Sequence, residues 1–98
     1  MHLFSLRQSR RQGKKLEARF ELDDGRMKTV HFGAAGASDY TQHGDPERKA
    51  RYLARHERRE NWDDPTTAGA LSRWLLWNKP TLQASLKDYL KRFKFVRR

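Results

Sequence analysis

The sequence predicts an α+β fold in which an N-terminal β-hairpin packs on a small three-helix bundle, with basic arms at both ends of the chain. Alternating apolar and charged residues before an Asp-Gly pair indicate the hairpin. Apolar residues that recur every three or four positions in the second half of the chain indicate the helices. Positive charge gathered near both ends indicates the arms. We therefore expect a basic flexible arm over residues 1–14 and a single domain over residues 15–98.

The hairpin is predicted from about Lys15 to Phe32. Every second residue from Leu16 to Leu22 is apolar, the residues between them are charged, and the Asp-Gly pair at positions 24 and 25 then favours a tight turn. Two strands alone are only marginally stable in water. Later segments must therefore cover the apolar face of the hairpin.

The segment from Gly33 to Gly44 is predicted to be a connecting loop because small residues dominate its first half. Backbone N–H groups at Gly33 and Gly36 could receive a phosphate. Their spacing, however, matches neither a P-loop nor a dinucleotide-binding fingerprint. A plain connector is the preferred interpretation.

Three helices are predicted after this loop, over about 46–59, 65–78 and 81–94. Asp45 and Pro46 are typical of a helix start, and Thr81 can cap the last helix. The second helix is apolar over most of its surface and is expected to be the core helix. The hairpin should pack on apolar residues of the last two helices, which are Leu71, Trp74, Leu75, Leu82, Leu86, Leu90 and Phe93.

Positive charge is the feature of the composition that bears most on function. The chain carries 22 Lys and Arg against 12 Asp and Glu, and its net charge is +10. Residues 1–15 contribute +5, residues 46–60 contribute +3 and residues 81–98 contribute +5. A field of this sign attracts polyanions, so nucleic acid is the first class of partner to consider.

The first predicted helix carries a row of arginines, which we call the arginine ridge: Arg48, Arg51, Arg55, Arg58 and Arg59. Arg48, Arg51, Arg55 and either Arg58 or Arg59 recur at three or four residues, about one helical turn or about 5.4 Å apart, so successive guanidinium groups could follow neighbouring phosphates. The alternative is a solvated face on which the arginines pair with Glu47, Glu57 and Glu60. Both can hold at once.

The charge blocks predict binding to DNA or RNA through phosphates, with little sequence preference. The expected contacts are Arg7, Arg10, Arg11, Lys14, Lys15, Arg48, Arg51, Arg55, Arg58, Arg59, Lys91, Lys94, Arg97 and Arg98. Among the three tryptophans, Trp74 and Trp77 have the spacing of core residues, whereas Trp62 is open to either packing or base stacking.

Catalysis is not expected. The chain has no Cys, and none of its histidines and acids has a recognised metal-ligand spacing. No nucleophile has an oriented base in a recognisable pattern. We therefore expect no catalytic residues, no metal and no cofactor. A membrane partner is not expected either, because no apolar run approaches the roughly 18 residues that span a bilayer.

Motifs spread from Phe32 to Phe93, over about two thirds of the chain, share their spacing with a known family. They include Ser38–Thr41, Arg51–Tyr52, Glu60–Trp62, Asp64–Pro65, Thr67–Ala70, Ser72–Trp74, Leu76–Lys79 and Asp88–Tyr89. On these residues the chain resembles an uncharacterised family of small basic proteins from large DNA viruses of algae and amoebae and from some protists. The resemblance implies a common fold and a kind of source, but no activity and no site residues. The segment before Leu16 lies outside it.

Taken with the charge, the resemblance favours a non-enzymatic protein that binds nucleic acid in association with a genome or a virion. The alternative is a small structural subunit that cements a capsid, or a ribonucleoprotein such as an organellar ribosome. The nucleus, a virion or a virus factory is the expected location. The first fifteen residues, which contain no acid, also resemble a mitochondrial presequence, so the mitochondrial matrix stays open as a location.

Overall fold

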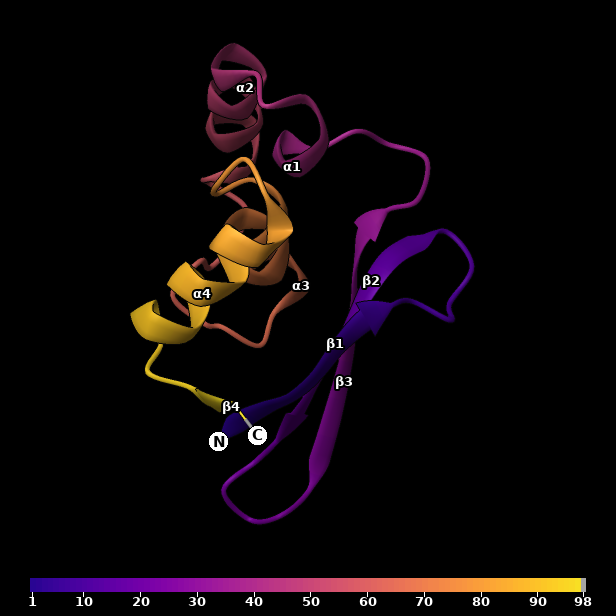
Figure 1. Ribbon diagram of the computed structural model, residues 1–98, viewed down its shortest axis with the longest axis vertical. Helices are drawn as coiled ribbons and strands as arrows, with labels where there is room; N and C mark the ends of the chain where they lie inside the picture. Colours follow the sequence, from indigo (N-terminus) through magenta and orange to yellow (C-terminus); the bar gives the residue numbers. More distant parts are fainter. Residues whose placement is uncertain (98) are drawn as a thin grey trace.

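A sheet lies on one side of the molecule and the helices lie on the other (Figure 1). This computed structural model describes residues 1–97. The strands are β1 (His2–Gln8), β2 (Lys14–Glu21), β3 (Met27–Ala34) and the short β4 (Val96–Arg97), in the spatial order β3-β2-β1-β4. β1, β2 and β3 are antiparallel, whereas β4 runs parallel to the start of β1. The predicted α+β class is confirmed at this level.

The predicted hairpin corresponds to β2 and β3. Leu16 lies opposite Phe32, and Ala18 lies opposite Val30, so the alternating apolar residues share one face. The turn contains Gly25, whose φ of +87° is a backbone conformation that residues other than glycine rarely adopt. The Asp-Gly signal in the sequence therefore indicated the right place for the turn.

The helical side consists of α1 (Tyr40–His43), α2 (Pro46–His56), α3 (Ala68–Leu71), the π-helical turn η1 (Ser72–Leu76) and α4 (Leu82–Arg92). The starts of α2 and α4 agree with the predicted caps, because the side chains of Asp45 and Thr81 accept hydrogen bonds from backbone N–H groups of the first turn. The predicted second helix begins later, at Ala68, because Thr67 is the residue that caps it.

The helices differ from the expected three-helix bundle in their arrangement. α3 continues directly into η1, which packs against α4, while α2 lies at one end of the molecule (Figure 1). No residue of α2 is buried. Only the last two predicted helices therefore supply the core that covers the sheet.

The core forms where the inner face of the sheet meets α3, η1 and α4. Its fully enclosed members are mainly apolar, with Leu3, Phe20, Phe32, Leu71, Leu75, Leu76 and Tyr89 at less than 4% exposure. Trp74 packs against this cluster, as predicted. The phenol of Tyr89 donates a hydrogen bond to the Pro65 carbonyl at 2.7 Å, so its polar atom is satisfied in the interior.

The prediction of a flexible arm over residues 1–14 is wrong for His2–Gln8, which form β1. Leu3 is 1% exposed and lies opposite Phe20, while Leu6 lies opposite Ala18. The register shifts between Leu3 and Ser5, so the two leucines are three residues apart and still pack on the same side. This bulge breaks the period of two by which a strand is detected in a sequence.

We predict that Leu3→Ala lowers the free energy of unfolding by about 2 to 5 kcal/mol, because it removes a fully buried side chain from the core. Phe4→Ala is the matched control. Phe4 is 46% exposed and contacts the Arg19 guanidinium 5.6 Å from its ring centroid, so we expect a loss below about 1 kcal/mol. Urea denaturation of both variants measures the difference. Equal and negligible effects would mean that the segment is an arm after all.

Candidate nucleic-acid interface

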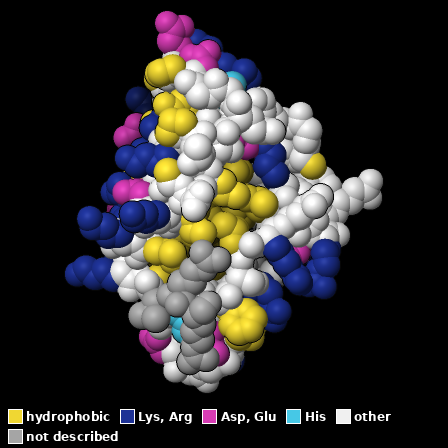
Figure 2. Space-filling view, in the orientation of Figure 1, with side chains coloured by type: hydrophobic (Ala, Val, Ile, Leu, Met, Phe, Trp, Pro, Cys, Tyr) yellow, Lys and Arg dark blue, Asp and Glu magenta, His cyan; other side chains and the backbone are white. Residues whose placement is uncertain are grey.

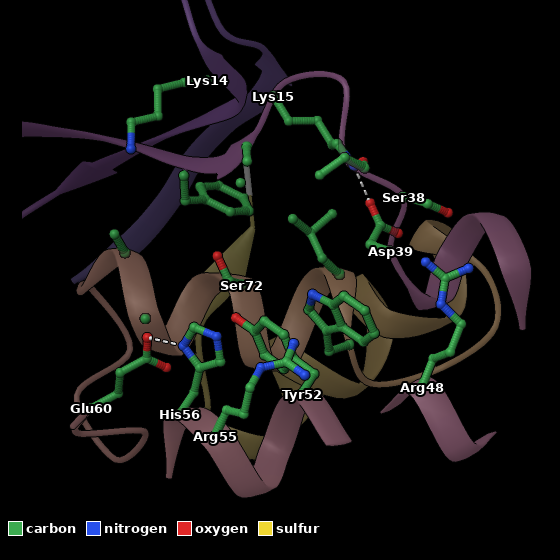
Figure 3. Close-up of a pocket in the computed structure, with 18 of the residues that line it drawn as sticks. Lys14, Lys15, Ser38, Asp39, Arg48, Tyr52, Arg55, His56, Glu60 and Ser72 are labelled. Carbon is green, nitrogen blue, oxygen red and sulfur yellow. Dashed lines mark hydrogen bonds and ion pairs between the residues drawn. The ribbon is translucent and has the colours of Figure 1, made fainter. Parts of the chain in front are cut away.

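A cavity of about 620 Å³ opens between the end of the sheet and α2 (Figure 3). Five basic side chains line it: Lys14, Lys15, Arg48, Arg51 and Arg55. We call this cavity the cationic cleft. In Figure 3 the two lysines come from the strand on one side, whereas Arg48 and Arg55 come from the helix opposite. The fold thus brings together basic residues that are more than thirty positions apart in the sequence.

The strand side of the cleft is positioned by a close backbone contact. Gly33 has a φ of +80°, and a Cβ atom at this position would lie 2.8 Å from the Leu76 Cδ1 atom and 3.1 Å from the Lys15 Cβ atom. Only glycine therefore lets the end of β3 lie this close to η1. The contact joins the sheet to the apolar floor of the cleft, which includes Phe32, Leu76 and Trp77.

The helix side of the cleft is held by stacked aromatic rings. The ring of Tyr52 lies parallel to that of Trp77, with 4.2 Å between centroids and 6° between planes. His56 stacks on Tyr52 at 4.1 Å. Burial raises the pKa of Tyr52 to about 12, so its phenol stays neutral in a cleft that is otherwise positive. These rings fix α2 beside η1 with its arginines at the cleft.

Both acids that line the cleft are already engaged. Asp39 is buried and accepts hydrogen bonds from the Lys15 ammonium and the Thr41 backbone N–H. Glu60 accepts hydrogen bonds from the Trp62 indole at 2.8 Å and contacts His56 Nδ1 at 3.0 Å. Neither carboxylate pairs with a cleft arginine. The positive charge of the helix side is therefore not neutralised from within the cleft.

The predicted phosphate contacts fall into two groups: basic side chains that already have a hydrogen-bond or ion-pair partner within the protein, which we call occupied, and those that do not. Lys15 belongs to the occupied group, because its three ammonium donors reach Asp39, the Ala37 carbonyl at 2.6 Å and Gln42 Oε1 at 3.1 Å. It ties the loop after β3 to the strand, so its role is structural. Within residues 1–97, the side chains of Lys14, Arg48 and Arg55 have no hydrogen-bond or ion-pair partner.

Arg51 has one weak partner. Its Nη1 atom lies 3.9 Å from Glu47, and both side chains are largely exposed. Such pairs are worth under about 1 kcal/mol. Of the three glutamates considered as partners of the arginine ridge, Glu47 is the one that lies within 4 Å of a ridge arginine in the described part of the chain. The ridge is therefore exposed, as the alternative expected, but it is not extensively paired.

Two arginines near the N-terminus contact a buried glutamate. Glu17, in β2, has no exposed surface and accepts hydrogen bonds from the Arg10 backbone N–H at 3.0 Å and from Arg7 Nε at 3.3 Å. The Arg10 guanidinium lies 3.6 Å away. The Arg10 N–H, followed by Arg7, holds the pKa of Glu17 below its ordinary value. Arg7 and Arg10 are thus part of the fold, in contrast to the expected free arm.

The other predicted contacts lie outside the cleft. Arg11, Arg58, Arg59, Lys91 and Lys94 are exposed but do not line it. Arg97 belongs to β4, and its side chain, like the whole of Arg98, lies outside the described part of the structure. Four of the fourteen predicted contacts, Lys14, Arg48, Arg51 and Arg55, therefore converge on one cavity without being fully engaged elsewhere.

The aromatic part of the cleft was not predicted from the sequence. Tyr52 and His56 lie four residues apart on one helix, a spacing at which side chains meet, and this signal could have drawn attention to them. Trp77 was expected in the core and packs against it while also lining the cleft. Trp62 is half-buried, donates to Glu60 and lies beside the Arg73 guanidinium, so packing describes it better than base stacking.

Among residues 1–97, no three His, Cys, Asp or Glu side chains are grouped so that they could hold a metal ion. In the same part of the chain, no helix is long and apolar enough to cross a membrane.

A profile of a family of unknown function, DUF5754, matches residues 4–56. The chain belongs to this family. The match includes most of the segment before Leu16, which the resemblance noted above did not cover, and it contains Lys14 and the three cleft arginines of α2. Membership of an uncharacterised family is thus confirmed, whereas the viral origin stays a prediction. No curated protein and no solved structure matches the chain.

We predict that Glu17→Gln lowers the melting temperature at neutral pH and that its difference from the wild type shrinks in acid. The pKa of Glu17 in the folded protein lies below its ordinary value of 4.5. The stability that its ionisation contributes is therefore fully present above about pH 4.5, and it is lost as the pH falls through the folded-state pKa. Thermal unfolding between pH 7 and pH 3 measures this effect. Glu57→Gln, at an exposed carboxylate, is the control. A parallel pH dependence of Glu17→Gln and wild type would contradict the prediction.

Proposed function

We propose that this protein binds nucleic acid through phosphates, without base specificity and without catalysing a reaction, and that the cationic cleft is its principal contact. The convergence of Lys14 and the α2 arginines on one cavity carries the proposal. Lys14 is the first residue of β2 and the arginines lie on a separate helix, so no local charge run accounts for their meeting.

The electrostatics of the cleft favour a polyanion. Five basic and two acidic side chains line it, and both acids are engaged by other groups. Concave sites with low-dielectric walls concentrate the field of their charges. Arginines present a planar set of donors that can bind a phosphate through two hydrogen bonds, and the exposed Arg48 and Arg55 retain these donors.

Basic residues outside the cleft extend the positive field. Figure 2 shows Lys and Arg side chains along the helical side of the molecule and again beside the sheet, with hydrophobic side chains exposed between them. Such a surface favours rapid, salt-dependent association with nucleic acid over a larger area than the cleft. We propose that the exposed Arg11, Arg58 and Arg59 contribute in this way.

The second candidate is a structural subunit of a large assembly, and one observation favours it. An open groove of about 500 Å³ runs along α4, and Leu86 and Leu90 line it beside Lys87. A partly apolar groove on a helix can receive a protein segment. Binding of nucleic acid at the cleft and of protein at this groove are compatible, as in a ribonucleoprotein.

We predict that replacing Arg48, Arg51 and Arg55 together by Gln makes the salt dependence of binding shallower by about 2 to 3 units of log K per log salt, since each lost phosphate contact removes about 0.7 to 0.9. Gln keeps the helix propensity, so circular dichroism should not change. Fluorescence anisotropy with labelled DNA and RNA across a salt series measures the slope.

The matched control is Lys87→Gln, Lys91→Gln and Lys94→Gln, which removes the same charge from exposed positions that do not line the cleft. We expect this control to retain most of the wild-type slope. Equal slopes for the arginine variant and the wild type, or no binding by the wild type at about 50 mM salt, would refute the proposed function.

A further inference from the structure

We infer that the cationic cleft receives a single, unpaired strand of nucleic acid in preference to a duplex. The inference rests on the proposed function and concerns the kind of nucleic acid bound at the same site. The shape of the cleft, the position of its cations and the chemistry of its floor each support it.

The size of the cleft suits about one or two nucleotides. Its volume of about 620 Å³ lies within the range of roughly 300 to 1,000 Å³ that encloses ligands of nucleotide size. A duplex presents a convex surface of stacked and paired bases with phosphates on the outside, so it could touch only the rim. An unpaired strand can instead lie within the cleft between the sheet and α2.

The cations occupy opposite sides of this space. Lys14 extends from the strand side, whereas Arg48 and Arg55 extend from the helix (Figure 3). One phosphodiester chain running between them could be contacted from both sides at once. Proteins that bind single strands use such a positively charged groove to follow the backbone. A flat or convex basic surface would be the corresponding arrangement for duplex phosphates.

The floor of the cleft is apolar and offers a surface for bases. The buried Phe32 and Leu76 lie at its base, and the half-buried Trp77 and the exposed Ala34, Ala37 and Ala68 present apolar surface to the cleft. An unpaired base has exposed faces and edges that gain free energy from such a surface, whereas a paired base has its faces covered by its neighbours. Trp77 and His56 cover both faces of the Tyr52 ring, so a base would lie against the floor and not insert between these rings.

Fluorescence anisotropy on labelled strands of about 20 nucleotides tests the inference. The ligands are oligo(dT), oligo(U) and a mixed-sequence duplex of the same length, at a common salt concentration. We expect the wild type to bind one or both single strands at least about tenfold more tightly than the duplex, a difference of about 1.4 kcal/mol. The two single strands distinguish DNA from RNA as the preferred source.

A variant that fills the cleft tests whether the preference for single strands arises there. Ala34→Leu with Ala68→Leu adds bulk at two exposed positions that line the cleft and leaves the charge unchanged. We expect single-strand affinity to fall about tenfold and duplex affinity to stay within about twofold. The control is Ala50→Leu with Ala54→Leu, two exposed alanines of α2 that do not line the cleft, and it should bind like the wild type.

Circular dichroism verifies that each variant is folded, and Ala68→Leu alone replaces the double variant if the latter does not fold. Salt-dependent binding with equal affinity for duplex and single strands would overturn this inference while leaving the proposed function intact. Full single-strand affinity in a folded cleft-filling variant would also overturn it. Absence of binding to every nucleic acid would instead refute the proposed function itself.

Discussion

The parallel stack of Tyr52 on Trp77 is the contact on which the cleft depends. No residue of α2 is fully buried, so few side chains hold this helix to the rest of the molecule. The ring stack does so, and the Lys49 ammonium adds a hydrogen bond of 2.7 Å to the Asn78 carbonyl. The π-helical turn contributes as well, since the Trp77 N–H bonds to the Ser72 carbonyl five residues back and Trp77 then ends η1 beside α2.

The basic residues of this chain have two different roles. Arg7, Arg10 and Lys15 satisfy the buried carboxylates of Glu17 and Asp39, and these pairs allow a sheet with a small apolar core to retain polar groups in its interior. Most other cations are exposed. Net charge alone therefore overstates the number of side chains that are available to a polyanion.

Charged side chains also take part in the packing of the helical layer. The guanidinium groups of Arg73 and Arg92 both lie over the Trp74 ring, at 4.2 Å and 3.9 Å from its centroid. Burial, followed by the charge of Arg92, lowers the pKa of Arg73, and Arg73 also donates to the Trp77 carbonyl at 2.8 Å. Arginine stacks well on aromatic rings because its planar group is weakly hydrated. In a small domain with limited apolar volume, such contacts extend the core to its margin.

Local patterns in the sequence determined the hairpin and the caps of two helices, because each depends on residues within a few positions of one another. They also indicated the row of arginines on α2. They did not determine which side of α4 faces the core, since Ser85 and Tyr89 are its buried residues while the predicted Leu86 and Leu90 line an open groove. The tertiary structure decided the rest. The bulge at Phe4 interrupts the alternation of apolar residues by which β1 could have been recognised. The stack of Tyr52 on Trp77 places the α2 arginines across the cleft from Lys14. The close approach of Gly33 to Leu76 completes the floor of the cleft. The ion pairs of Lys15, Arg7 and Arg10 with buried carboxylates could not be predicted either, because the packed fold is what brings these residues together. A count of charges along the chain does not tell which basic residues already have an acidic partner.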